Sequence, residues 1–139
     1  MKKGPKIDEL KQIWEYHKGR SDEARNKSNC TGEELRALQA QLARNAENDD
    51  FSDLQRSEAN QKLKRLKKSL DAELEELHGL LVITQKAEIE YMQNLRRLKE
   101  ARTVLDTIAN PPCWGLGDIA PADLYAIKNR AEQTVRELS

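Results

Sequence analysis

The side chains best suited to catalysis or metal binding are few in this chain, and their spacing does not form a site. The two histidines, His17 and His78, lie far apart in the sequence, and neither occurs at a spacing typical of metal ligands. The two cysteines, Cys30 and Cys113, form neither a CxxC motif nor a disulfide framework. We therefore expect a protein that is not an enzyme and that needs no metal and no cofactor.

The composition favours a helical protein. Charged residues make up 35% of the chain and aromatic residues only 4%, whereas Leu, Ala, Glu, Lys, Arg and Gln, all good helix formers, are abundant. A compact globular domain normally has a larger apolar share, so high charge combined with helical periodicity indicates a coiled coil or a slender helical bundle. At 139 residues the chain is expected to form a single all-α domain.

The balance of charge argues against some partners. The 24 basic and 24 acidic residues cancel, which disfavours the broad positive field of a non-specific nucleic-acid binder. The N-terminus is charged and lacks the apolar segment of a signal peptide, and the longest apolar run, 80–83, is far too short to cross a membrane. These features predict a cytoplasmic protein without a membrane partner.

Apolar periodicity predicts four helices, at about 7–27, 32–46, 52–109 and 121–138. The polar run 26–29 is expected to end the first helix. Thr31, with Glu34 three residues later, is expected to begin the second helix as a capping box. Ser52 is expected to cap the third helix.

Prolines mark the boundaries of the last two predicted helices. Pro111 cannot continue the hydrogen-bond ladder of the third helix, whereas Pro121 suits the first turn of the fourth. The fourth helix then carries an apolar stripe that is expected to pack on the third. Its members are Leu124, Ile127, Ala131, Val135 and Leu138.

The third predicted helix, 52–109, is the central element of an elongated helical bundle or coiled coil. Placing successive residues 100° apart puts the apolar side chains of 63–81 on one sector and those of 87–105 roughly a quarter turn away. Because this shift occurs near Gly79, either the helix is continuous and presents two faces, or it breaks near 79–86 into a hairpin. We favour the continuous helix, since one glycine costs only about 1 kcal/mol in a helix.

A leucine seam in the long helix has a charge pattern suited to self-association. Its members, Leu63, Leu66, Leu70, Leu74, Leu77 and Leu81, recur at intervals of three and four residues. Basic residues flank its first half and acidic residues its second half: Lys62, Lys64, Arg65 and Lys67, then Asp71, Glu73, Glu75 and Glu76. An antiparallel pair of these helices centred on Leu70 would place leucine opposite leucine and basic residues beside acidic ones, whereas a parallel pair would bring like charges together.

Three kinds of partner could cover this leucine seam. A second copy of the chain would give a two-fold antiparallel homodimer, whose interface must be self-complementary. Alternatively, the other helices of the same chain cover the leucines, which then form an internal core. The third option is a protein of different sequence.

The loop that follows the long helix is the most distinctive non-helical segment. It concentrates rigid and large apolar residues in a chain that has few aromatic ones, and Trp is common in interface hot spots. The loop is therefore a candidate partner-binding tip, and the alternative is that Trp114 packs into the end of the bundle. The candidate residues are Pro112, Cys113, Trp114, Leu116 and Asp118.

Two basic clusters suggest an alternative function. One lies at 62–68, and the other consists of Arg96, Arg97, Lys99 and Arg102. Both could contact phosphates. The first cluster, however, spreads around its helix, and no zinc-finger, RNA-recognition or helix-turn-helix spacing accompanies either cluster. Nucleic-acid binding is therefore the second hypothesis.

A charged helical chain without a catalytic constellation suits binding better than turnover, because catalysis needs a concave site that excludes water. We expect a helical protein–protein interaction module of the bacterial or phage type. It would act as an adaptor, a scaffold or a small inhibitor of a larger protein machine. Its expected partners are another protein and, through the leucine seam, a second copy of itself.

Overall fold

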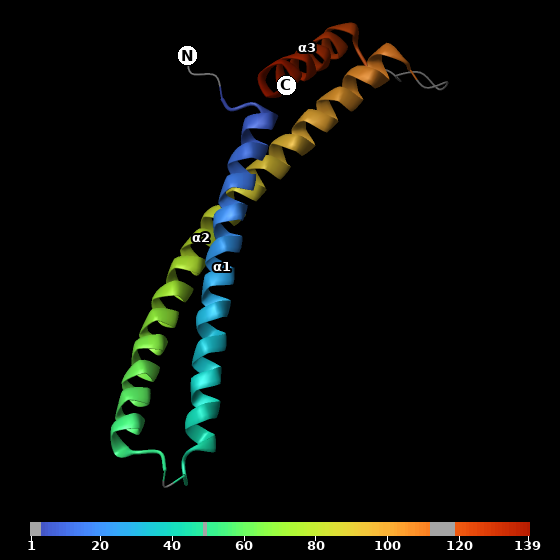
Figure 1. The fold of residues 1–139 in the computed structure, drawn as a ribbon. Helices are drawn as coiled ribbons and strands as arrows, with labels where there is room; N and C mark the ends of the chain where they lie inside the picture. Colours follow the sequence, from blue (N-terminus) through green and yellow to red (C-terminus); the bar gives the residue numbers. More distant parts are fainter. Residues whose placement is uncertain (1–3, 49, 112–118) are drawn as a thin grey trace. The chain divides into compact units, whose positions relative to one another are not determined.

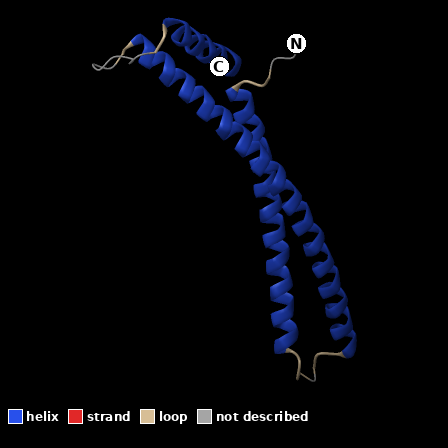
Figure 2. Cartoon of the chain, turned by 180° about the vertical axis from the view of Figure 1, so that it is seen from behind, coloured by secondary structure: helices blue, strands red, loops and turns tan. Residues whose placement is uncertain are grey.

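The computed structural model describes residues 4–48, 50–111 and 119–139, which form three α-helices and no strand (Figure 1). Helix α1 spans Ile7–Arg44, α2 spans Asp53–Ala109 and α3 spans Pro121–Leu138. The view from behind, coloured by secondary structure, shows the described residues as helices and loops (Figure 2). The predicted all-α class is confirmed.

The chain divides into two compact units. His17–Thr84 form what we call the hairpin unit, and Met1–Tyr16 together with Gln85–Ser139 form the terminal unit. Helices α1 and α2 each contribute a segment to both units, whereas α3 belongs to the terminal unit alone.

Helix α1 is continuous, so the predicted break after residue 27 is wrong. The hydroxyl groups of the polar residues at this point form hydrogen bonds to backbone carbonyls of the same helix. Ser28 Oγ donates to the carbonyl of Arg25 at 2.9 Å, and Thr31 Oγ1 donates to the carbonyl of Lys27 at 3.2 Å. Because each hydroxyl bonds to the preceding turn, Thr31 is an interior residue and not the helix cap that the sequence suggested.

Helix α2 is also continuous, so the predicted alternative of a break near 79–86 does not occur. Its start is as predicted: Ser52 N donates to Gln55 Oε1 at 2.9 Å, and Gln55 N donates to Ser52 Oγ at 3.1 Å, which is a reciprocal capping box. Its end is also as predicted, since the helix stops at Ala109, two residues before Pro111.

In the hairpin unit, α1 and α2 run antiparallel on either side of the turn between them (Figures 1 and 2). Along both helices, buried and half-buried residues recur at alternating intervals of three and four, the spacing of a helix that packs along one neighbour. On α1 they include Ser21, Ala24, Ser28, Thr31, Leu35, Leu38 and Leu42. On α2 they include Arg56, Ala59, Leu63, Leu66, Leu70, Glu73, Leu77, Leu80 and Thr84.

Part of this hairpin interface is polar. Thr84 Oγ1 lies 2.6 Å from Ser21 Oγ, 2.7 Å from the carbonyl oxygen of Leu80 and 3.0 Å from the carbonyl oxygen of His17. Ser21 and Ser28 are both buried. Since buried hydroxyls need partners, this layer favours the one register in which Ser21 meets Thr84.

The turn of the hairpin is held by Arg56. Its guanidinium donates to the carbonyls of Ala46 at 3.0 Å and of Asn45 and Asn48 at 3.2 Å, and it lies 5.8 Å from the centre of the Phe51 ring. The last carbonyls of a helix have no partner inside the helix. Arg56, on α2, therefore ties the residues that follow α1 to the start of α2.

The terminal unit packs the first residues of α1, the last part of α2 and α3 around a small apolar core. Its buried residues are Leu10, Leu98, Ala101, Ala131 and Leu138, and Leu98 is only 1% exposed. Trp14 stacks on Tyr91 with ring centres 5.6 Å apart.

The end of α3 is tied to the other two segments of the terminal unit. Lys6 Nζ donates to the carbonyl of Ser139 at 2.8 Å, and Arg102 Nη2 donates to Ser139 Oγ at 3.3 Å. Basic side chains are favourable at this end of a helix, where the dipole is negative.

Candidate interaction surfaces

The six leucines of the predicted seam do not form one free face. Leu63, Leu66 and Leu70 are half-buried and Leu77 is buried, all at positions of the stripe that packs in the hairpin. Leu74, by contrast, is 46% exposed. Leu81 is half-buried and lies two helical turns further along the same side as Leu74. Part of the seam therefore packs inside the hairpin, and the rest lies on an open flank of α2.

The charged residues predicted to flank the seam are exposed, with one exception. Glu73 belongs to the half-buried stripe, and its Oε2 is buried with no hydrogen-bond partner among the residues that the structure describes. It lines a hollow of about 200 Å³ together with Arg20, Glu23, Ala24, Lys27, Glu76 and Leu80. Glu73, predicted as a charge that flanks the seam, thus lies on the packing stripe itself. Polar residues also occupy the packing stripe.

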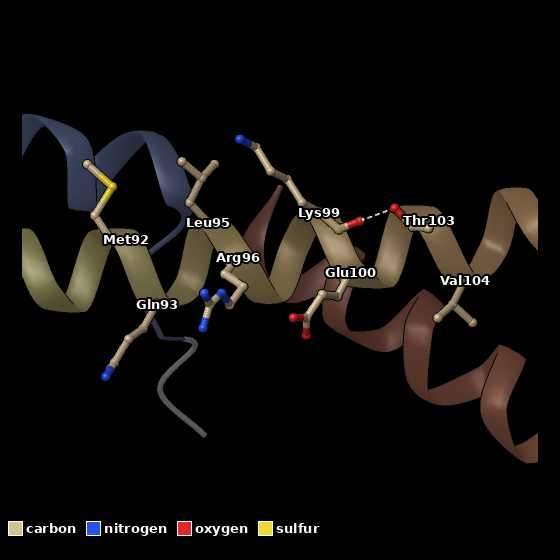
Figure 3. Close-up of a pocket in the computed structure, with 8 residues that line it drawn as sticks. All are labelled: Met92, Gln93, Leu95, Arg96, Lys99, Glu100, Thr103 and Val104. Carbon is tan, nitrogen blue, oxygen red and sulfur yellow. Dashed lines mark hydrogen bonds between the residues drawn. The ribbon is translucent and has the colours of Figure 1, made fainter.

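A larger hollow lies along α2 in the terminal unit (Figure 3). Its volume is about 870 Å³, and its lining consists of Met92, Gln93, Leu95, Arg96, Lys99, Glu100, Thr103 and Val104. Met92, Leu95 and Lys99 point to one side of the helix, whereas Gln93 and Glu100 point to the other (Figure 3). Met92 is 43% exposed, and Leu95 and Val104 are half-buried.

A second hollow, of about 620 Å³, lies between α2 and α3. From α2 it is lined by Arg97, Glu100, Ala101 and Val104, and from α3 by Asp123, Ala126, Ile127, Arg130, Ala131 and Thr134. Ile127, a member of the apolar stripe predicted for the last helix, is 42% exposed. No sequence pattern indicates this surface, because it exists only where α2 and α3 meet.

The second basic cluster is divided among different neighbours. Arg96 and Lys99 line the hollow along α2. Arg97 Nη1 donates to Asn94 Oδ1 at 3.1 Å, and Arg102 bonds to Ser139. Two of the four predicted phosphate contacts are thus engaged in contacts within the protein.

The remaining candidate residues form no site in the described parts of the chain. His17 is half-buried on the α1 stripe, His78 is exposed, and Cys30 is a free, exposed cysteine. Within residues 4–48, 50–111 and 119–139, no group of three His, Cys, Asp or Glu side chains could hold a metal ion. The predicted partner-binding loop, with Pro112, Cys113, Trp114, Leu116 and Asp118, lies outside the described residues.

None of the described helices is both long and apolar enough to cross a bilayer. Comparison with protein-family models, with curated proteins and with solved structures finds no match to this chain.

Proposed function

We propose that this chain is a non-enzymatic helical interaction module, an adaptor, a scaffold or a small inhibitor, that works by occupying a surface of another protein. The observation that supports this proposal is the set of apolar side chains left open on helices that already pack. Such side chains mark interaction sites when they gather at the edge of a packed interface. Leu74, on the hairpin unit, is the clearest case, with 46% of its surface exposed beside the half-buried Leu70.

The partner proposed for the hairpin unit is a second copy of the chain, packed as an antiparallel coiled coil or four-helix bundle. Two helices cover only one side of each other, whereas each helix in a four-helix bundle buries a wider stripe. A second hairpin would cover the open flank that contains Leu74 and Leu81. Centred on Leu70, it would also bring Lys67 of each copy beside Asp71 of the other.

The strength of this pairing would come mainly from apolar burial. Each square ångström of apolar surface removed from water contributes about 25 cal/mol, whereas an exposed ion pair contributes about 0–1 kcal/mol. The charges of Lys67 and Asp71 would instead select the antiparallel orientation, because a parallel pair would place each charge beside its own kind.

The solution mass of the chain and of two glutamate variants tests this proposal. We expect the wild type to have about twice the 15.9 kDa mass of one chain by light scattering on a size-exclusion column. Leu74→Glu should reduce the mass to one chain and leave the helical content unchanged, because Leu74 is exposed within its own hairpin.

The matched control is Leu54→Glu. Leu54 is 69% exposed near the start of the same helix, away from the proposed pairing flank. This variant should keep the mass of the wild type. A monomeric wild type, or equal dissociation of both variants, would contradict pairing through the flank of Leu74.

Nucleic-acid binding is the alternative function. It requires Arg96, Arg97, Lys99 and Arg102 to bind phosphates together, whereas Arg102 donates to Ser139 Oγ and lines neither hollow of the terminal unit. It predicts binding to a DNA or RNA duplex that weakens steeply with salt and is lost in the double variant Arg96→Ala, Arg97→Ala.

A further inference from the structure

We propose that the two hollows of the terminal unit form one docking groove for an amphipathic helix of a protein partner, with acidic residues flanking its apolar face. The hollow along α2 and the hollow between α2 and α3 share Glu100 and Val104, so they adjoin. The proposal rests on the role of the chain as an interaction module, and it specifies a surface and the chemistry of the partner.

The docking groove is long enough to hold a helical segment. Met92 and Val104, at the two ends of the hollow along α2, are about 18 Å apart at 1.5 Å per residue. This length corresponds to about three helical turns, which is enough for apolar anchors at the i, i+3 or i+4, and i+7 positions of a bound helix.

The lining of the docking groove combines small buried residues with larger exposed ones. Ala101 and Ala131 line the hollow but are buried, so they belong to the core and offer little surface to a partner. Met92 and Ile127 are both more than two-fifths exposed, and they offer apolar surface to a bound side chain. Methionine is flexible and adapts to differently shaped partners, as it does on other helix-binding surfaces.

The charges around the docking groove favour an acidic partner. Among the described residues, four basic ones line it, Arg96, Arg97, Lys99 and Arg130, against two acidic ones, Glu100 and Asp123. Complementary charge at the rim of an apolar groove speeds association and selects partners. An acidic amphipathic helix uses both features of the groove, whereas a nucleic-acid backbone would leave the apolar lining uncovered.

Titration of the isotope-labelled full chain with three synthetic peptides, followed by amide chemical shifts, tests the proposal. The first is an 18-residue amphipathic helix with leucine and alanine on one face and glutamate on the other. The second replaces each glutamate with lysine, and the third scrambles the first. We expect the glutamate peptide to shift amides of 92–104 and 123–134 and to bind at least tenfold more tightly than the lysine peptide. The scrambled peptide should not saturate.

Variants of exposed lining residues connect the binding to the groove. Met92→Glu and Ile127→Glu should each weaken the glutamate peptide at least tenfold, through lost apolar contact and added like charge. The matched control is Tyr125→Glu, since Tyr125 is 68% exposed on the same helix as Ile127 but does not line the groove. This control should bind like the wild type.

Several results would overturn the proposal. They are the absence of saturable groove shifts with the glutamate peptide, equal affinity for the lysine peptide, and unchanged binding by both lining variants. Groove shifts caused by a DNA duplex at comparable affinity would assign the surface to nucleic acid, and groove shifts that depend on protein concentration alone would assign it to a second copy. The mass of Leu74→Glu concerns the hairpin unit, so pairing can hold when groove binding fails.

Discussion

The hairpin unit contains two helical segments and the terminal unit three, and the burial of their apolar side chains differs accordingly. In the terminal unit, Leu98 is 1% exposed and Leu10 is buried. In the hairpin unit, Leu38, Leu77 and Leu80 are 8–9% exposed, and Leu63, Leu66 and Leu70 are half-buried. A single neighbour covers one side of a helix, whereas a third segment closes a core. We therefore expect a second copy to add more to the hairpin unit than to the terminal unit.

The two units also differ in what specifies their packing. The hairpin unit buries hydroxyls, with Ser21 bonded to Thr84. The terminal unit stacks Trp14 on Tyr91. Buried hydrogen bonds fix a register but contribute little net stability, about 1 kcal/mol each, whereas large apolar groups contribute more. The bond between Ser21 and Thr84 is thus expected to contribute more to the register of the hairpin unit than to its stability.

Removing the most buried side chain of the terminal unit should have the largest effect. We expect Leu98→Ala to lower the free energy of unfolding by about 3 kcal/mol, the cost of a cavity in a closed core. Urea unfolding followed by circular dichroism at 222 nm measures this change. The control is Ile89→Ala on the same helix, where the side chain is exposed and the loss should stay below about 0.5 kcal/mol. Equal losses would contradict the closed core.

Removing the guanidinium that holds the turn should loosen the hairpin unit alone. Arg56→Ala deprives the carbonyls of Ala46, Asn45 and Asn48 of their donor, which we expect to cost about 2 kcal/mol. Amide hydrogen exchange should accelerate at 42–56 and stay unchanged around Leu98. Arg56→Lys keeps the positive charge but loses the forked donors of the guanidinium. Its amide exchange rates at the turn should therefore lie between those of the wild type and those of Arg56→Ala. Unchanged exchange in Arg56→Ala would show that the turn holds without it.

Replacing a glycine within α2 should have the smallest effect, and it should be stabilising. Gly79 lies in a regular helix with open space where a Cβ would be, so Gly79→Ala should stabilise the hairpin unit by about 1 kcal/mol. The thermal midpoint should rise by a few degrees. Gly4→Ala, which lies outside the helices, should change nothing. A lower midpoint for Gly79→Ala would contradict a continuous helix at this point.

Signals that act locally could be predicted from the sequence. The cap at Ser52 and the helix boundaries at Pro111 and Pro121 depend on hydrogen bonds and dihedral angles of adjacent residues. The break expected before Thr31 does not occur, and the hydroxyls of Ser28 and Thr31 bond instead to carbonyls of the preceding turn.

Features that depend on contacts between helices could not be predicted in the same way. Apolar periodicity predicted that Leu74 follows Leu70 on the packed face of the helix. In the structure, the residue that follows Leu70 on the packed stripe is Glu73. When the polar residues Glu73 and Thr84 are counted as packed positions, the two apolar faces predicted for the long helix join into one stripe. The groove at Ile127 required the position of α3 on α2, which no local pattern contains.

The most direct test of antiparallel pairing is disulfide cross-linking of single cysteines in a chain whose Cys30 and Cys113 are replaced by serine. Asp71 and His78 are both exposed and lie seven residues apart on the same side of α2. In a pair centred on Leu70, the two Asp71→Cys positions lie about 3 Å apart along the helix axis, and the two His78→Cys positions about 24 Å apart. A disulfide needs Cα atoms within about 7 Å of each other.

We therefore predict that Asp71→Cys forms a covalent dimer under mild oxidation and that His78→Cys does not. Denaturing electrophoresis without reductant measures the covalent fraction. Equal cross-linking of both variants would indicate a parallel pair. No cross-linking of Asp71→Cys at concentrations where the wild type has the mass of two chains would contradict pairing through this flank.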